Sequence, residues 1–289
     1  MLDAARQALL DAGLLSPDDP PPHFSVRMSG NIGLLFYLEN GEFYLTKVGL
    51  STRLDREYRG LSEAYRAMPS NVPEPIRLAT YHRYQVLVIR GIPHEPLFPL
   101  RRADVGVLKE GIISFVASSS CAFRQSGRSE SLERLHEALR NASRRVQWPD
   151  WEKYWERVRL FAERLTPVRQ HGDLAVNNIG VHKGKLIFFD WEDFGEIDLP
   201  GFDLSMLLLS MNGFSFAGVL ARLKGSSLEA DIMARIGESL GMSPADFLSL
   251  FPAYAALYIQ TKPRLGYPDA AVDRIVGALS EWIQLESHR

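Results

Sequence analysis

The sequence predicts an α+β protein with two parts, a small β-rich part followed by a larger, mainly helical one. In the first part an Asn-Gly pair separates two β-rich runs, residues 33–38 and 43–48, which is a strong signal for a β-hairpin. In the second part apolar residues recur at steps of three and four, the spacing of amphipathic helices. Gly91-Ile92-Pro93 breaks the pattern, so we place a hinge there, with residues 1–90 before it and residues 91–289 forming the second part.

Two helices and a second pair of strands are expected around the hairpin. The apolar side chains of residues 2–12 fall on one helical stripe, and Gly13 ends that helix. Helical spacing returns in residues 54–68 and stops at Pro69. The second pair of strands is expected at residues 76–80 and 84–89.

The second part is expected to contain several helices and one more hairpin. Its helices are expected at residues 103–123, 130–144, 150–165, 204–211 and 253–261, and the hairpin at residues 181–189. We interpret the aromatic stripe of residues 150–165 as core packing rather than a ligand site. Cys121, the single cysteine, cannot form an internal disulfide, and we interpret it as a core thiol in preference to a nucleophile.

Composition excludes some classes of partner. The chain has 289 residues, 46% of them hydrophobic, which suffices for a substantial core. Its net charge of -2 gives no overall attraction for nucleic acid or anionic lipid, so neither is expected as a partner. The start of the chain lacks the apolar region of a signal peptide, and the longest strongly apolar run, residues 204–211, is far shorter than the roughly 20 residues of a membrane span. We therefore expect a cytoplasmic protein.

Three oxygen-bearing side chains surround the second hairpin. Asn178 stands just before it and Asp190 at its end, so the antiparallel arms should bring the two side by side. Asp and Asn oxygens suit Mg²⁺, which takes one or two protein carboxylates and leaves its other positions to water and phosphate. Asp173, five residues before Asn178, is placed to accept a proton from an attacking hydroxyl. The pattern predicts a metal-phosphate site.

These residues resemble the catalytic loop of the aminoglycoside phosphotransferase and choline kinase family. The matching segments, in order, are His171-Gly172-Asp173-Leu174, Asn178, Phe189-Asp190-Trp191-Glu192 and Gly201-Phe202-Asp203-Leu204. The resemblance implies a protein-kinase-like, two-lobed fold, with Asp173 as the catalytic base and with Asn178 and Asp190 holding Mg²⁺. It implies that His171 supports the loop, with proton transfer as the alternative. Asp203 either orders the loop or caps the following helix.

The same resemblance assigns nucleotide contacts to the first part. Lys47 would contact the α- and β-phosphates of ATP, and Glu57 would hold the lysine. An exposed lysine and an exposed helix glutamate are the alternative. The other expected nucleotide contacts are the turn at Ser29 and Gly30, which would cover the phosphates, and backbone groups of the strand and hinge at Ile89 and Gly91, which would meet adenine.

The function that follows is an ATP- and Mg²⁺-dependent phosphotransferase. Residues 1–90 would clamp the nucleotide, and residues 91–289 would bind a small-molecule hydroxyl substrate of aminoglycoside, sugar or amino-alcohol type. An acidic cluster next to the metal motif either faces a cationic substrate or is solvated; its members are Glu192, Asp193, Glu196 and Asp198.

Other classes of protein fit the sequence less well. A nucleotide-binding pseudokinase with a regulatory role is the main alternative function. A protein kinase is disfavoured because no D-F-G occurs, and a Walker-type ATPase because no G-x-x-x-x-G-K-[ST] occurs. A serine hydrolase built on residues 213–217 would need a strand before that turn, whereas a helical run precedes it.

Overall fold

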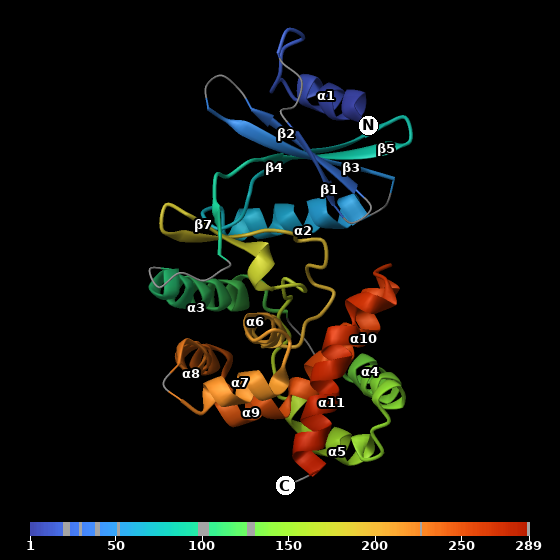
Figure 1. Cartoon of the computed structure of the whole chain (residues 1–289), viewed down its shortest axis with the longest axis vertical. Helices are drawn as coiled ribbons and strands as arrows, with labels where there is room; N and C mark the ends of the chain where they lie inside the picture. The colour runs from blue at the N-terminus through green and yellow to red at the C-terminus, as the bar shows by residue number, and fades with distance from the viewer. Residues whose placement is uncertain are drawn as a thin grey trace. The chain divides into compact units, whose positions relative to one another are not determined.

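A computed structural model gives the structure of the protein and describes residues 1–19, 24–28, 31–37, 41–50, 53–97, 104–125, 131–225 and 227–287. The chain forms two compact units (Figure 1). The first unit comprises residues 1–97 together with residues 178–194, and the second comprises residues 98–177 and 195–289. The first contains the described strands and the second is helical, so the predicted α+β class is confirmed.

The first unit is built on a five-stranded antiparallel sheet. Its strands, in spatial order, are β1 (Phe24–Met28), β2 (Asn31–Tyr37), β3 (Phe43–Gly49), β5 (Tyr84–Arg90) and β4 (Pro75–Tyr81). Pairing of Leu34 with Thr46 across β2 and β3 confirms the first hairpin, and pairing of Leu78 with Leu87 confirms the second pair of strands, β4 and β5. The Asn40 position of the predicted turn lies outside the described residues.

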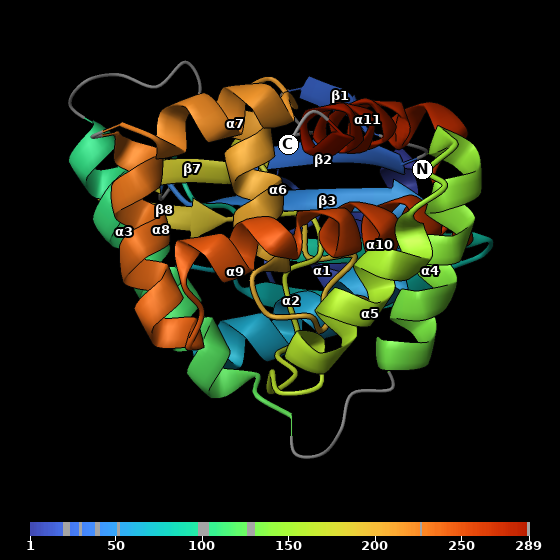
Figure 2. The ribbon, with the colours of Figure 1, turned by 90° about the horizontal axis from the view of Figure 1, so that it is seen from below.

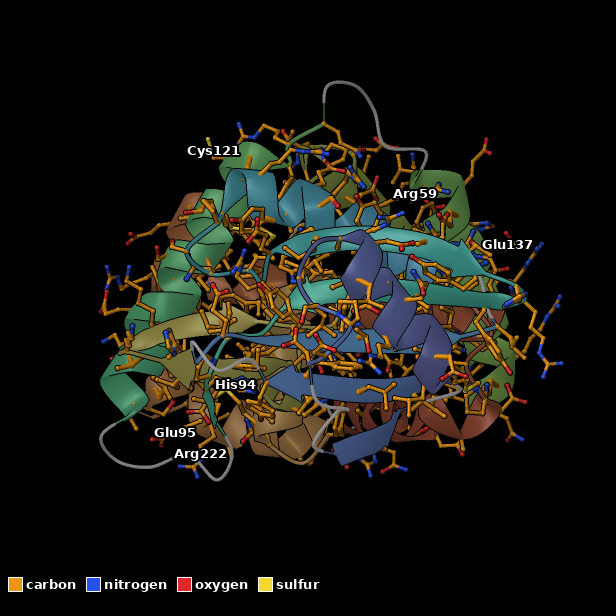
Figure 3. All side chains as sticks on the ribbon, turned by 90° about the horizontal axis from the view of Figure 1, so that it is seen from above. Arg59, His94, Glu95, Cys121, Glu137 and Arg222 are labelled. Atoms are coloured by element: carbon orange, nitrogen blue, oxygen red, sulfur yellow. The ribbon has the colours of Figure 1, made fainter. Side chains whose placement is uncertain are left out.

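Helices α1 (Leu2–Asp11) and α2 (Arg53–Ala67) lie on opposite faces of this sheet (Figures 1 and 3). The face toward α1 is apolar: Ala5, Leu9, Phe36 and Val88 are buried together there. Successive side chains of a strand point to opposite faces. Because Val48 belongs to the α1 face, its neighbour Lys47 points to the α2 face.

The second predicted hairpin is confirmed and belongs to the first unit. It consists of β7 (Ile179–His182) and β8 (Lys185–Phe188), and β6 (Glu95–Pro96) pairs with β7. Asn71, in the turn after α2, fastens the hairpin. Its side-chain amide donates to the Leu186 carbonyl at 2.9 Å, and its carbonyl accepts from the Phe188 amide at 2.8 Å. A single residue therefore holds β8 at two positions, Leu186 and Phe188.

The second unit is a bundle of helices (Figure 2). They are α3 (Asp104–Ala122), α4 (Ser131–Val146), α5 (Trp151–Ala162), α6 (Phe202–Met211), α7 (Phe216–Leu223), α8 (Leu228–Leu240), α9 (Pro244–Ser249), α10 (Phe251–Arg264) and α11 (Asp273–Ser287). Helix α10 packs against α4 and α11, and α3 packs against α8. Nearly every residue of α10 before Arg264 is buried or half-buried, so this helix is central to the bundle.

Helix α3 carries the most apolar long segment among the described residues. By length and composition its residues Val105–Ala122 would suffice to cross a membrane, and so would the bent pair α6 and α7 taken together. In α3, however, Leu108, Ile112 and Phe115 are buried against the unit, whereas Ser118 and Cys121 are exposed. This is the pattern of a helix packed on a globular core. The expected burial of Cys121 is wrong, because it lies on the face opposite the buried stripe (Figure 3).

Candidate functional site

In the first unit, Lys47 joins two carboxylates on the α2 face of the sheet. Its Nζ lies 2.5 Å from Glu57 Oε1 on α2 and 3.1 Å from Asp190 Oδ1, after β8. Lys47 is only 6% exposed and Glu57 3%. The alternative of an exposed lysine and an exposed glutamate is therefore wrong for these two side chains.

Burial and charge act against each other in this cluster. Burial alone lowers the pKa of Lys47, but the neighbouring Glu57 and Asp190 carboxylates outweigh it and raise the pKa above its ordinary value. For Glu57, burial dominates: it raises the pKa to about 7, although Lys47 opposes the shift. The lysine is therefore firmly cationic, and its charge is shared between two acids. An added phosphate would find a fixed, desolvated ammonium.

Asn178 and Asp190 are neighbours, as the sequence analysis expected. The carbonyl of Asn178 accepts from the Phe189 amide at 2.9 Å, directly beside Asp190. Asp190 has a positive φ of 65°, which is uncommon for a residue with a side chain and often marks a functional constraint. One amide and one carboxylate oxygen fit the preferences of Mg²⁺. Among the described residues, no three His, Cys, Asp or Glu side chains gather as a zinc-type site would require.

Gly60 is a supporting residue that the sequence analysis missed. It lies on α2, one turn after Glu57, against the segment that follows Asp190. A Cβ at this position would stand 2.4 Å from the Trp191 carbonyl oxygen and 2.8 Å from Phe194 Cβ. Only glycine therefore lets α2 come this close. A helix glycine normally destabilises, so one in the interior of α2 is the signal that was available.

The end of β5 is held in place from both sides. The Gly91 amide donates to the Phe43 carbonyl at 2.8 Å, and a Cβ on Gly91 would collide with the Phe43 ring. Ile89 is buried and pairs with Leu45 of β3. The Gly91 amide is thus engaged within the sheet. Ser29 and Gly30 lie outside the described residues.

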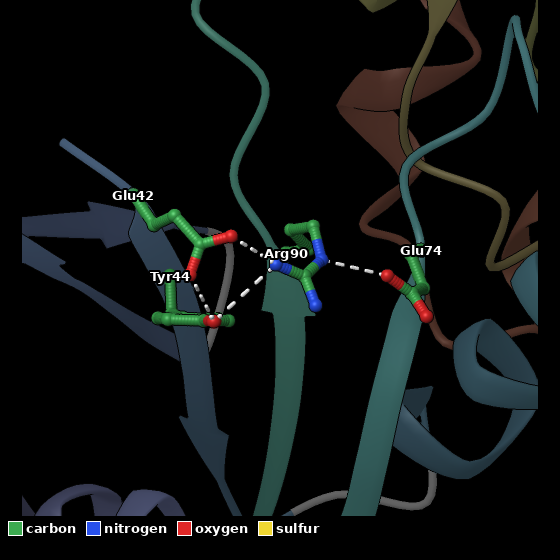
Figure 4. A network of polar contacts seen from close by, with 4 residues as sticks. All are labelled: Glu42, Tyr44, Glu74 and Arg90. Atoms are coloured by element: carbon green, nitrogen blue, oxygen red, sulfur yellow. Dashed lines mark hydrogen bonds and ion pairs between the residues drawn. The ribbon is translucent and has the colours of Figure 1, made fainter. Parts of the chain in front are cut away.

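Arg90, between these two residues, forms a network of polar contacts (Figure 4). Its Nε lies 2.7 Å from Glu74 Oε2 and its Nη1 2.7 Å from Glu42 Oε1. Nη1 also donates to the hydroxyl of buried Tyr44. These groups are partly exposed, so the ion pairs contribute little stability. Their effect is to fix the strand end relative to its neighbours.

In the second unit, Asp203 organises the loop that carries Asp173. Its carboxylate accepts from the His171 amide at 2.6 Å and from the Gly172 amide at 3.0 Å. Gly201, not Asp203, is the N-cap of α6, so the loop-ordering interpretation is the one that the geometry supports. Burial raises the pKa of Asp203, against the opposing effect of His171 and both amides.

His171 also supports the loop. It is buried, and its Nδ1 accepts from the Asp173 amide at 3.3 Å. This contact fixes the backbone at Asp173 and agrees with a supporting role for the histidine. Further along the loop, the Val176 amide donates to the Ser210 hydroxyl at 3.1 Å, which ties the loop to α6.

Lys262 is the second residue that the sequence analysis missed. It lies in the last turn of α10, is 2% exposed, and places its Nζ 2.8 Å from Asp173 Oδ1. The rings of Tyr258 and Tyr267 lie 5.1 and 4.5 Å from the same nitrogen, within range of a cation-π interaction. Nothing local in the sequence relates Lys262 to Asp173, because 88 residues separate them.

The predicted acidic cluster is not a uniformly solvated loop. Asp193 is buried in the first unit, and Glu196 in the second unit pairs with Arg264 at 2.7 Å. The alternative of a solvated acidic loop is therefore wrong for Asp193, whereas Glu196 is partly exposed and forms a surface ion pair.

Comparison with known proteins gives one family and one fold. A model of the phosphotransferase enzyme family matches residues 29–238. A thermostable mutant of aminoglycoside phosphotransferase APH(4)-Ia, in ternary complex with AMP-PNP and hygromycin B, is similar with a TM-score of 0.62 at 13% identity, over 98% of each chain. Amicoumacin kinase hAmiN, in complex with AMP-PNP, Ca²⁺ and Ami, gives a TM-score of 0.58 at 14% identity, over 98% of this chain and 93% of its own.

A third structure extends the likeness. An aminoglycoside-3'-phosphotransferase of type VIII gives a TM-score of 0.54 at 16% identity, over 89% of this chain and 98% of its own. No curated protein sequence matches significantly. These similarities confirm the predicted kinase-like fold class.

Proposed function

The chain belongs to the phosphotransferase enzyme family, and on that premise we propose that it transfers the γ-phosphate of ATP to a hydroxyl group of a small molecule. One observation carries the proposal: the buried Lys47 ammonium held between Glu57 and Asp190. Burying the charged groups of Lys47 and Glu57 is costly, and a buried ion pair is weak evidence for stability. A phosphate-binding role accounts for the cluster.

We assign the nucleotide to residues 1–90 and the catalytic and substrate-binding roles to residues 91–289. Lys47 contacts the α- and β-phosphates, and Glu57 orients the lysine. Ile89 and Gly91 meet adenine through their backbone, and because the Gly91 amide already donates to Phe43, its carbonyl is the group assigned. Ser29 and Gly30 stay a prediction as the phosphate-covering turn.

Asn178 and Asp190 are the residues that would hold Mg²⁺. Bound there, the ion would neutralise charge on the transferred phosphate. The neighbouring structures support nucleotide binding, since two of them contain AMP-PNP.

Asp173 is the proposed base. As the substrate hydroxyl oxygen forms a bond to the γ-phosphorus, the bond from that phosphorus to the bridging oxygen breaks, and ADP leaves with the electron pair. The hydroxyl proton passes to Asp173 and then to solvent. His171 and Asp203 act on the backbone of this loop and keep the carboxylate in place.

The acceptor is proposed to be a small hydroxyl compound handled in the cytoplasm. APH(4)-Ia and amicoumacin kinase were crystallised with small-molecule ligands, hygromycin B and Ami, which supports that scale of acceptor. The alternative, a nucleotide-binding pseudokinase, would bind ATP without transferring phosphate.

The test is Mg²⁺-dependent transfer from labelled ATP to a panel of small hydroxyl compounds, with nucleotide binding measured in parallel. Asp173→Asn should lower turnover by about a hundredfold or more while nucleotide affinity stays nearly unchanged. Asp190→Asn should abolish turnover. Asp150→Asn, which alters an exposed ion pair with Lys153, is the matched control and should behave as the unaltered protein. Nucleotide binding with no transfer to any compound would favour the pseudokinase, and turnover retained in Asp173→Asn would refute the base.

A further inference from the structure

The last turn of α10 brings basic side chains to the carboxylates of the second unit. Lys262 pairs with Asp173 at 2.8 Å, and Arg264, two residues on, pairs with Glu196 at 2.7 Å. Directly before Lys262, Thr261 accepts a hydrogen bond from Arg134 of α4 at 2.8 Å. Lysine and arginine are favoured at this end of a helix because its carbonyls carry partial negative charge. One helix turn therefore supplies the cations for the region around the proposed base.

Three carboxylates of the second unit already have partners within the protein. Asp173 forms an ion pair with Lys262 and Glu196 with Arg264, and Asp203 accepts hydrogen bonds from the amides of His171 and Gly172. The Lys262–Asp173 pair is the more buried of the two ion pairs, with side chains 3% and 26% exposed against 56% and 28% for Arg264 and Glu196. An ammonium group on a substrate would meet a carboxylate whose charge is already balanced.

We propose that Lys262 occupies the place that a cationic group of the acceptor would take at Asp173, so that the acceptor carries no ammonium group beside its reacting hydroxyl. The acceptor is then a neutral or acid-bearing hydroxyl compound rather than a polycationic aminoglycoside. This inference rests on the proposed function, since it concerns the same base and the same acceptor.

Charge balance along the reaction supports the assignment. Before transfer, the negative charge of Asp173 and the positive charge of Lys262 cancel. Once the hydroxyl proton has moved to Asp173, the Lys262 ammonium stands uncompensated while the new phosphate ester carries negative charge. A cationic acceptor would duplicate the charge that Lys262 supplies. It would also have to compete for Asp173 with Lys262, a lysine whose side chain is only 3% exposed and for which loss of the carboxylate partner is unfavourable.

Two ligands with the same carbohydrate skeleton but different charge test the effect of charge, and the charge-altering variants of the protein separate it from the added bulk of the acetyl groups. Hygromycin B carries ammonium groups, and its fully N-acetylated derivative does not. Binding of each to the full chain is measured by calorimetry at low and at physiological ionic strength, and the result is the ratio of the two affinities. Lys262→Gln removes the charge and keeps a hydrogen-bond donor. Lys109→Met is the control, because Lys109 pairs with Asp231 at a partly exposed site between α3 and α8.

The unaltered protein and Lys109→Met should show no preference for the charged ligand. Lys262→Gln should shift the ratio of the two affinities toward hygromycin B by about tenfold or more. Lys262→Arg keeps the positive charge and should show the ratio of the unaltered protein. Arg264→Gln, at an exposed pair, should shift it less in the same direction and serves if Lys262→Gln does not fold.

Two results would overturn the inference. One is a preference of the unaltered protein for hygromycin B that disappears in Asp173→Asn. The other is an unchanged ratio, or no detectable binding, in both charge-removing variants. Nucleotide binding does not enter the ratio, so a chain that binds no ATP refutes the proposed function and leaves this test intact.

Discussion

Replacing Asp173 by Asn should lower the stability of the protein as well as its turnover rate. The change keeps an oxygen near Lys262 Nζ but removes the charge that balances a lysine only 2% exposed. Removing one partner of a fully buried ion pair costs about 3–5 kcal/mol. Asp173 is 26% exposed on its side chain, and the Tyr258 and Tyr267 rings stabilise the ammonium. We therefore expect a loss of about 2–3 kcal/mol, with partial exposure and cation-π contacts reducing the full value.

The assay is thermal and urea unfolding of four proteins: unaltered, Asp173→Asn, Lys262→Gln and the double variant. The single Asp173→Asn change should lower Tm by about 5–10 °C for a unit of this size. The double variant should recover at least about 1 kcal/mol relative to the sum of the single changes. Effects that add to within about 0.5 kcal/mol would show that the two side chains do not interact, and the reasoning on charge balance at Asp173 would fail.

Two further predictions concern the first unit. Gly60→Ala should destabilise the protein by about 1–3 kcal/mol and weaken nucleotide binding, because the new methyl group would collide with the Trp191 carbonyl. Gly277→Ala on α11 is the control. Space is open at that position, so the change should stabilise the protein by about 0.5–1 kcal/mol in the same unfolding assay. The pKa of Glu57 is raised from an ordinary 4.5 to about 7, so this side chain binds more protons in the folded than in the unfolded protein. Its contribution to the free energy of unfolding should therefore fall by about 3 kcal/mol in total as pH rises from 4.5 to 7. Urea unfolding from pH 4 to 8 should show this slope, and Glu57→Gln should flatten it; an equal slope in both would contradict the raised pKa.

Much of the architecture follows from local pattern. The Asn-Gly signal marked the first hairpin, the 3.6-residue period marked α2 and α5, and the proline after α2 marked its end. Each is a property of a few adjacent residues. Cys121 was misjudged because its helix is apolar nearly all round, so composition alone did not reveal which face of α3 is buried.

The hairpin at residues 179–188 was located correctly, but its membership of the first unit was not foreseeable. Its attachment runs through Asn71, whose amide and carbonyl bond to two residues of β8 more than 110 positions later. A single asparagine in a turn gives the same local signal whether or not it bonds to a distant strand. Long-range hydrogen bonds of this kind leave no periodic trace in sequence.

Some residues of the candidate site could likewise be identified from local sequence pattern, and others could not. Asp173, Asn178 and Asp190 lie within 18 residues of one another, so the predicted hairpin and the resemblance to a known catalytic loop brought them to notice. Lys47 and Glu57 stand on consecutive elements, and their pairing needs only the sheet face and the helix that covers it. Lys262 is neither close to Asp173 in sequence nor on a neighbouring element. A lysine near the end of a helix is already explained by its favourable interaction with the helix carbonyls. Only burial beside Asp173 separates it from a surface lysine, and burial at that position is decided by how α10 packs into the bundle. Residues that contact a site from a distant element, as Lys262 contacts Asp173, are thus the ones for which the folded structure is indispensable.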